Sequence, residues 1–452
     1  MMRTHTCGEL RKKDSGKKVT LAGWVDTIRS HGKITFIDLR DRYGKTQVVL
    51  KGIEDAVRLK NESIVLIKGE VKSRLKGREN PDLATGEIEV AAESMDILCN
   101  PPELPFQLHD ENINEEVRLK YRYIDLRRER MKNNIILRHK VKQVIHKYLD
   151  SKGFLDIETP LLTKRTPEGS RDYIVPSRLH AGKFYALPQS AQLYKQLLMV
   201  SGFDKYYQMA RCFRDEDLRK DRQPVFTQVD IEQSFVDEED LIKLIEGLLK
   251  KLWKEVLNID IKTPFPRMTY EEAMRKYHSD KPDMRKVWGT DFAFLWVVDF
   301  PLFEWSDEEN KLVSVHHPFT MPQEKDMYLL EKEPEKVKAR AYDIVLNGYE
   351  IGGGSIRVHD PKLQEKIFKI LKIDKKTAKR RFGFLVEALK YAPPHGGLAL
   401  GLDRICAIMT NSESIREVIA FPKNKQAKSP LTGAPSEVEK YLLEENHIKI
   451  VK

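Results

Sequence analysis

The fold is decided by residues 207–232, which read YQMARCFRDEDLRKDRQPVFTQVDIE. Two alternating runs, 207–213 and 226–232, enclose a charged loop, which predicts a pair of strands. In the second run Asp230 and Glu232 share one face and apolar residues share the other, which predicts a solvated polar floor. Arg214 follows the first run, and the loop carries enough cationic charge for a triphosphate or an RNA backbone. A solvated charged hairpin without a ligand is the alternative.

Residues on either side of this stretch indicate a mixed domain. Apolar residues at helical spacing between 141 and 149 predict an amphipathic helix that ends at Gly153. A strand closed by Pro160 follows, because proline cannot donate to a sheet ladder. Strand-like and helical runs then alternate, which predicts an α+β domain on a largely antiparallel sheet.

Two later segments carry candidate phosphate and metal ligands. In 343–357, DIVLNGYEIGGGSIR, a turn at Asn347-Gly348 makes Asp343 and Glu350 diagonal neighbours that can hold Mg²⁺. In 396–405, GGLALGLDRI, a strand runs into a helix whose first turn carries Arg404, a natural anion site. The alternatives are a surface hairpin with unrelated acids and a helix with a surface salt bridge.

The first hundred residues predict a small β-barrel. Five short β-like runs are separated by turn formers, and a helical stretch, 53–60, lies between the third and fourth, as in an OB-fold that binds single-stranded nucleic acid. Another small barrel is the alternative. We expect an OB-fold domain at 1–102, a proline-rich hinge or linker at 103–130, the α+β domain at 131–430 and a C-terminal tail at 431–452.

The composition excludes several classes of protein. The chain has 452 residues, 40% hydrophobic and 33% charged, with no apolar run long enough to cross a membrane and no CxxC pair among its four cysteines. A net charge of +10 suggests a polyanionic partner. No GxxxxGK[ST] loop is present, so a P-loop nucleotide site is not indicated.

Taken together, these segments resemble those of bacterial-type aspartyl-tRNA synthetases, of class II and subclass IIb, over nearly the whole chain. Supporting stretches are TPEGSRDY at 166–173, LPQSAQLYKQ at 187–196 and HHPFT at 316–320. One departure is plain: the chain passes quickly from 265–270 to 295–301, so the domain that bacterial relatives usually insert between the second and third motifs is missing or nearly so.

The resemblance implies a cytoplasmic ligase that activates L-aspartate with ATP and transfers it to tRNA(Asp). It implies Mg²⁺ as the cofactor. It also implies a homodimer that forms through the long helix and the strand ending at Pro160. His31 and Gly77 match the pattern of relaxed enzymes, so we hypothesise that tRNA(Asn) is charged as well.

By the same resemblance, residues receive roles. The catalytic residues are Arg214, Glu350 and Arg404. Aspartate binding falls to Glu168, Gln192, Lys195, Arg214, Asp230, His316, His317 and Arg357. ATP binding falls to Arg214, Asp215, Glu216, Gln223, Glu350, Gly401, Leu402, Asp403 and Arg404. Asp343 and Glu350 hold the metal. The resemblance also makes 1–102 the anticodon-binding domain and 131–430 the catalytic domain. The residues expected to bind tRNA are Arg29, His31, Phe36, Gln47 and Gly77.

Other functions stay open beside this one. An asparaginyl enzyme of the same subclass is disfavoured, because Lys195 and Arg357 would be left unpaired by a neutral side chain. A non-charging nucleotide- or RNA-binding paralogue has no need of Arg214, Glu350 and Arg404 together. Metal binding by the pair at 316–317 is set aside on the argument that adjacent strand residues point to opposite faces. Phe36 is either a base-stacking residue or part of the barrel core.

Overall fold

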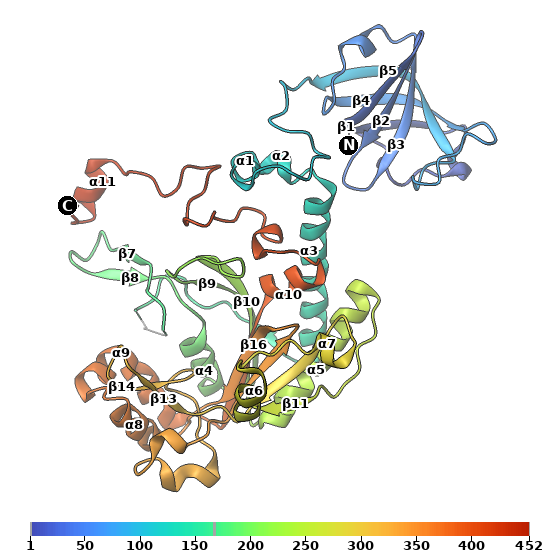
Figure 1. Ribbon diagram of the computed structural model, residues 1–452. Coiled ribbons are helices and arrows are strands. Elements are labelled where there is room, and N and C mark those ends of the chain that lie inside the picture. The colour runs from blue at the N-terminus through green and yellow to red at the C-terminus, as the bar shows by residue number, and fades with distance from the viewer. Residues whose placement is uncertain (1, 166–168, 452) are drawn as a thin grey trace. The chain divides into compact units, whose positions relative to one another are not determined.

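The computed structural model describes residues 2–165 and 169–451, and it divides into two compact units, Met1–Gln107 and Leu108–Lys452. Figure 1 shows the first unit as a barrel of strands and the second as a sheet flanked by helices. The second unit begins at Leu108, so much of the segment that we predicted as a linker belongs to a folded unit.

The first unit is a closed five-stranded barrel in the order β1-β2-β3-β5-β4, which confirms the OB-fold prediction. Its core is built by alternation: Ile37 and Leu39 on β2 have no exposed surface. A 3₁₀ helix, η2 (Glu54–Arg58), lies between the third and fourth strands. The barrel strands are β1 (Lys18–His31), β2 (Ile34–Arg40), β3 (Lys45–Lys51), β4 (Ile64–Ser73) and β5 (Ile88–Cys99), preceded by η1 (Lys12–Asp14).

The second unit is built on an eight-stranded sheet in the order β11-β12-β15-β16-β17-β10-β9-β6. Its pairs are antiparallel apart from β11 with β12 and β6 with β9, within the described residues. The strands are β6 (Leu155–Asp156), β9 (Lys205–Phe213), β10 (Val225–Ser234), β11 (Arg267–Thr269), β12 (Phe294–Val298), β15 (Ala341–Leu346), β16 (Tyr349–Ile356) and β17 (His395–Gly401). Two separate hairpins are β7 (Ile174–Pro176) with β8 (Phe184–Ala186) and β13 (Phe303–Ser306) with β14 (Lys311–Ser314).

Two long helices, α3 (Glu129–Ser151) and α5 (Glu238–Leu257), pack together and against the sheet through one large apolar cluster. Asp237 caps α5 and forms a reciprocal capping box with Asp240, and Asn258 ends the helix in the left-handed conformation. Such an N-cap contributes about 1 kcal/mol. α10 (Leu402–Met409) joins the same cluster, so the helix that carries Arg404 is anchored by its apolar side.

A second group of helices lies beside the sheet at the other end of the unit. α4 (Gln192–Val200), α8 (Pro361–Ile370) and α9 (Lys375–Ala388) share a cluster centred on Phe319 and Phe382. The remaining helices are short: α1 (Glu115–Lys120), α2 (Arg122–Asp125), α6 (Tyr270–Tyr277), α7 (Arg285–Trp288), η3 (Glu324–Leu329), η4 (Pro334–Lys336), η5 (Leu389–Tyr391), η6 (Ile415–Glu417) and α11 (Lys440–Glu445).

At the position where bacterial relatives usually carry the inserted domain, a short connection joins β11 to β12. β11 pairs in parallel with β12, and only α6 and α7 lie between these two strands among the described elements. In the described residues no helix is both long and apolar enough to span a bilayer, and none of the four cysteines forms a disulfide.

Candidate active site

The centre of the site is a buried cluster of four charges on the floor formed by β10. Lys195 of α4 donates to Asp230 and lies 3.3 Å from Glu232 Oε2. Arg357, just past β16, donates two parallel bonds to Glu232, at 2.9 Å from Nε and 3.1 Å from Nη2. All four side chains are at most 2% exposed, so the prediction of a solvated floor was wrong. Because the two cations and the two carboxylates neutralise one another, their burial costs less free energy than the burial of an unpaired charge.

Burial and pairing act against each other on the acids of this cluster. Burial raises the pKa of Asp230, and the nearby Lys195 does not fully reverse this. Burial also acts to raise the pKa of Glu232, but the attraction of Arg357 and Lys195 outweighs it and holds that pKa below its usual value. Glu232 therefore keeps its negative charge more readily than Asp230 does.

His317 completes the cluster as a neutral side chain. Arg357 Nη1 lies 2.7 Å from His317 Nε2, and Ser355 Oγ accepts from the same guanidinium nitrogen. Burial, and then the positive charge of Arg357, lowers the pKa of His317 well below its ordinary value. A neutral imidazole can accept a hydrogen bond from the guanidinium at Nε2, so it orients Arg357 without adding a third positive charge.

Two buried polar atoms of this region have no hydrogen-bond partner in the described structure. They are the acceptor Asp230 Oδ2 and the donor Gln192 Nε2. Buried polar atoms are nearly always paired, so an unpaired acceptor and an unpaired donor indicate a ligand with both kinds of group. An α-amino acid has an ammonium and a carboxylate. Glu168, the other predicted ammonium ligand, lies outside the described residues.

A polar pocket adjoins the cluster along β10, because Gln228 lines it from two residues before Asp230, on the same strand face. Seven of the nine predicted ATP residues line this pocket: Arg214, Glu216, Gln223, Glu350, Gly401, Asp403 and Arg404. Asp215 and Leu402 do not. Leu402 has no exposed surface and belongs to the apolar core, because the helix turns it inward.

The charged side chains of this pocket are held in different ways. Arg214 stacks over Phe226, 5.1 Å from the ring centroid, and Glu216 lies 3.3 Å from Arg222. Arg404 donates to the carbonyl of Glu350 and lies 3.2 Å from Asp221 Oδ2. Arg404 therefore already has an anionic partner, which a phosphate would have to replace.

Two of the predicted ATP residues are occupied by the protein itself. Gln223 donates to the carbonyl of Lys423 at 3.1 Å and accepts from its backbone N–H at 2.8 Å. Asp403 accepts from Thr227 N–H at 2.8 Å and pairs with Arg138 of α3. Both side chains thus fix the walls of the pocket. The sequence indicated their place but not these partners, which lie far away along the chain.

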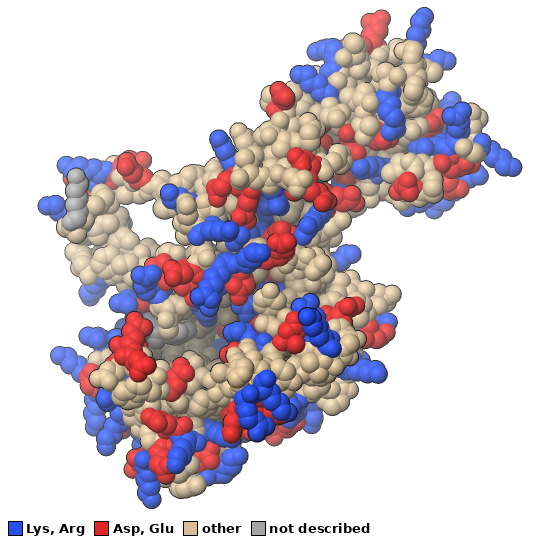
Figure 2. Space-filling view, in the orientation of Figure 1, with Lys and Arg blue, Asp and Glu red and all other residues tan. Residues whose placement is uncertain are grey.

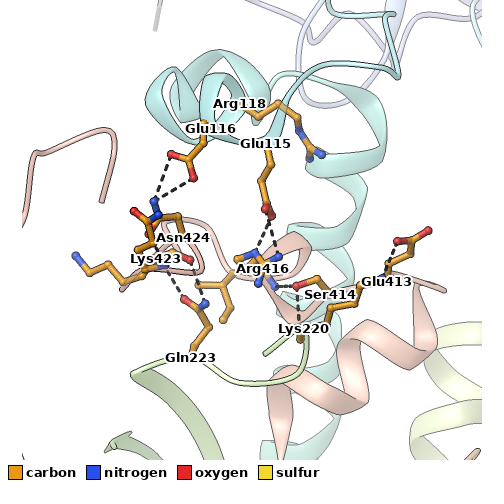
Figure 3. Close-up of polar contacts among 12 residues, drawn as sticks. Glu115, Glu116, Arg118, Lys220, Gln223, Glu413, Ser414, Arg416, Lys423 and Asn424 are labelled. Carbon is orange, nitrogen blue, oxygen red and sulfur yellow. Dashed lines mark hydrogen bonds and ion pairs between the residues drawn. The ribbon is translucent and has the colours of Figure 1, made fainter. Parts of the chain in front are cut away.

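The charged loop of the pocket is also fastened from outside (Figure 3). Ser414 Oγ donates to the carbonyl of Lys220 at 2.9 Å, and Arg416 donates to Glu115 of α1 at 2.7 Å. Asn424 donates to Glu116 at 3.0 Å. Residues 413–424 therefore join the loop to α1. Sequence reasoning missed this support, because single polar residues in 413–424 show no motif.

The predicted metal pair meets at Gly353. A β-bulge after Ile344 places Asp343 opposite Gly353 while Val345 faces Glu350. A Cβ on Gly353 would lie 2.4 Å from Asp343 Oδ1 and 3.7 Å from Glu350 Oε1, so only glycine leaves the space that both carboxylates face. Burial, and then the charge of Asp343, raises the pKa of Glu350. A hard cation fits this pair of oxygen donors, although no group of three or more potential ligands occurs among the described residues.

The two adjacent histidines point to different partners, but not for the reason we gave. They lie in a bend after β14, not in a strand. His316 Nε2 lies 3.1 Å from Asp343 Oδ1, whereas His317 contacts Arg357. His316 therefore belongs beside the carboxylate pair, and only His317 borders the cluster of four charges.

On the barrel, Phe36 lies outside the core. It is half-buried, its neighbour Ile37 fills the interior, and the His31 ring lies 6.1 Å away, edge to face. Arg29 is held by Asp38 at 2.9 Å and Gln47 donates to Glu89 at 2.9 Å. Gly77 has a φ of +81° in an open loop. These residues share the strand face that points away from the barrel interior, apart from the loop glycine.

Comparison with known proteins places these features in a family. The profile of "tRNA synthetases class II (D, K and N)" matches residues 114–425, and that of the "OB-fold nucleic acid binding domain" matches residues 19–98. Two relatives, from Thermotoga neapolitana and Thermotoga maritima, are 46% and 45% identical over the full length of both chains, and each is named aspartate–tRNA(Asp/Asn) ligase. The first alignment spans 580 positions against the 452 residues of this chain, which leaves 128 positions without a counterpart here.

Solved structures agree on the fold. An asparaginyl-tRNA synthetase from Pyrococcus horikoshii, complexed with asparaginyl-adenylate, superimposes with a TM-score of 0.78 at 24% identity, covering 93% of this chain and 98% of the other. An aspartyl-tRNA synthetase from Entamoeba histolytica gives 0.73 at 21% identity, covering 92% and 90%. At these identities the structures establish the architecture alone.

Proposed function

The chain belongs to the class II tRNA synthetases (D, K and N), and from that premise we propose how it works as an aspartate–tRNA ligase. Its substrates are L-aspartate, ATP and tRNA. In the first step an α-carboxylate oxygen of aspartate attacks the α-phosphorus of ATP and pyrophosphate leaves. In the second, a terminal ribose hydroxyl of tRNA attacks the activated carbonyl and AMP leaves. Both steps need alignment and charge neutralisation more than a strong base.

The observation that carries the proposal is the charge balance of the buried cluster. If the substrate ammonium takes the free oxygen of Asp230, then Lys195, Arg357 and Glu232 remain with a net charge of +1. A side-chain carboxylate of charge −1 completes that set, whereas the neutral amide of asparagine does not. This replaces our earlier argument from two unpaired cations, because both cations are paired with carboxylates.

The remaining roles are those that the family resemblance implies, and their support is that Arg214, Arg404 and Glu216 line one pocket. Arg214 reaches the α-phosphate and the substrate carboxylate, with its guanidinium braced on Phe226. Arg404 binds the γ-phosphate, and Glu216 faces the adenine. Asp343 and Glu350 would hold Mg²⁺, which supplies positive charge to the phosphates of ATP. Gln223 and Asp403 act by positioning the walls, as their backbone partners indicate.

Exchange of labelled pyrophosphate into ATP tests the amino acid directly. L-Aspartate should support exchange, and L-asparagine should be weaker by roughly 100-fold or more because it leaves a buried charge uncompensated. The same assay separates the alternatives. Exchange with asparagine alone would make the chain an asparaginyl enzyme, and no exchange with either would make it a binding paralogue.

The tRNA partner is proposed to include tRNA(Asn) as well as tRNA(Asp). The support is the pattern at His31 and Gly77 and the tRNA(Asp/Asn) in the names of the relatives. Both positions lie on the barrel, His31 at the end of β1 and Gly77 in the loop after β4. Charging of the two purified transcripts with labelled aspartate settles the point, and absence of aspartyl-tRNA(Asn) would restrict the enzyme to tRNA(Asp).

We also propose a cytoplasmic homodimer. Four cysteines that form no disulfide among the described residues suit a reducing compartment. Leu155 on the edge strand β6, and Leu161 and Leu162 beyond it, are each about half exposed. This suits an interface along β6 and the segment that follows it to Pro160, although the strand itself ends at Asp156. Light scattering at micromolar concentration would show twice the 52.6 kDa of one chain, and a single-chain mass would contradict the dimer.

A further inference from the structure

Residues 361–381 have a net charge of +7, whereas the whole chain has a net charge of +10. This segment holds nine cations and two acids. It forms α8, a short turn and α9. Figure 2 shows Lys and Arg along the lower left margin of the molecule, where Figure 1 places these two helices. The candidate active site does not use this charge.

The two helices enclose a groove of about 920 Å³. Its floor is apolar, with Phe368, Ile373 and Val386, and its rim is basic. We call it the lysine groove and define it by six rim residues: Lys362, Lys366, Lys369, Lys372, Lys375 and Lys379. Long lysine stems can cover apolar surface and keep the ammonium groups in water, which explains why apolar floor and charged rim occur together.

The rim charges are available to a ligand. Among the described residues, the only rim lysine with a carboxylate within ion-pair distance is Lys366, which lies 3.1 Å from Glu331. All six are exposed. Lys362, Lys366 and Lys369 recur at helical spacing on α8, so they repel one another along one face. Like charges gathered in this way attract a polyanion.

The lysine groove is joined to the amino-acid site through packing within the second unit. Leu193 of α4 packs with Phe368 and Phe382 of the two groove helices, and α4 carries Lys195. Gln364 of α8 donates to the carbonyl of Pro318 at 2.7 Å, next to His317. The groove helices therefore pack directly against the helix that carries Lys195.

We propose that the lysine groove binds the phosphate backbone of the acceptor arm of tRNA. This inference rests on the proposed function, because it assigns a surface to the same substrate. The acceptor arm carries the end that receives aspartate, and regularly spaced phosphates match a rim of regularly spaced ammonium groups. An acidic protein would match the charge too, but it is favoured less because the neighbouring site already requires an RNA end.

The test compares two triple variants. Lys369→Gln with Lys372→Gln and Lys379→Gln removes three rim charges, and Lys243→Gln with Lys250→Gln and Lys262→Gln removes three exposed charges on and beyond α5. Neither set includes a residue with an ion pair in the described structure. Both variants should fold, since every changed side chain is exposed, and thermal unfolding checks this.

Binding of tRNA(Asp) transcript is measured from 50 to 200 mM salt. Each lost phosphate contact lowers the slope of log K against log salt by about one, so the groove variant should lose about three from the slope. Over this fourfold range the wild type should then weaken by roughly 40-fold more than the groove variant. The control should behave as wild type.

An acceptor-stem minihelix locates the contact. If the groove variant shows the same decrease in the slope of log K against log salt with the minihelix, the groove contacts the acceptor arm. A decrease seen only with whole tRNA would overturn that assignment. A groove variant that matches the control with both RNAs would overturn RNA binding at the groove. Aspartate-dependent pyrophosphate exchange needs no tRNA, so it should be unchanged, and its absence in wild type would instead contradict the proposed function.

Discussion

Replacing Arg357 separates its structural role from its role in binding aspartate. Arg357 is 1% exposed and bonds to the fully buried Glu232 at 2.9 and 3.1 Å. Arg357→Leu leaves that carboxylate with Lys195 as its remaining cation. Breaking a buried pair from one side costs about 3–5 kcal/mol. We therefore expect the free energy of unfolding to fall by that amount.

The same substitution should lower kcat/KM for aspartate. Loss of a buried, charge-assisted contact worth about 3–5 kcal/mol corresponds to a decrease of roughly 10²–10⁴-fold, at 1.36 kcal/mol for each factor of ten. ATP affinity should stay within about twofold of wild type, since Arg214 and Arg404 are untouched. Pyrophosphate exchange and ATP titration measure the two quantities on the same preparation.

A second substitution keeps the test sharp. Arg357→Leu combined with Glu232→Gln removes both charges of the pair, so most of the lost stability should return. Exchange should stay low, because the aspartate side chain still lacks one of its two cations. Glu232→Gln alone is the matched control. If the double variant recovered exchange together with stability, Arg357 would only support the fold, and the assigned role in recognition would be refuted.

Three further outcomes follow from the barrel and the pocket. Phe36→Ala should raise the KM for tRNA by roughly 5–150-fold, the loss of one stacked base at about 1–3 kcal/mol, and should spare pyrophosphate exchange; an equal fall in exchange would make Phe36 a folding residue. Asp343→Asn should weaken Mg²⁺ binding, and the loss of Mg²⁺ affinity on acidification should occur at a lower pH. Burial and then Asp343 raise the pKa of Glu350, and Mg²⁺ binding requires ionised Glu350. Removing the neighbouring charge of Asp343 therefore lowers that pKa. If Mg²⁺ titrations across pH showed this loss of affinity at the same pH as in wild type, the coupling would be contradicted. Asp221→Asn should lower the KM for ATP by about 1.5–5-fold, because a partly exposed pair worth about 0.2–1 kcal/mol no longer competes for Arg404; a raised KM in steady-state kinetics would show that Asp221 assists binding.

Local patterns predicted the elements because short-range physics decides them. The turn at Asn347-Gly348 forms with φ values of +55° and +82°, which these two residue types tolerate. Alternation along β10 placed Asp230 and Glu232 on one face. Within the described residues, seven of the nine predicted ATP residues line one pocket, because their motifs lie at the ends of strands that the tertiary structure joins in one sheet.

The sequence by itself determined the elements, the barrel, the catalytic motifs and the sign of the charge. Only the tertiary structure decided what those charges meet. Glu232 is buried because Lys195 and Arg357, distant in sequence, close over it, and a strand pattern cannot distinguish a buried polar face from a solvated one. The lysine groove likewise exists only after two helices pack, because charge is a property of residues, whereas burial and concavity are properties of their packing.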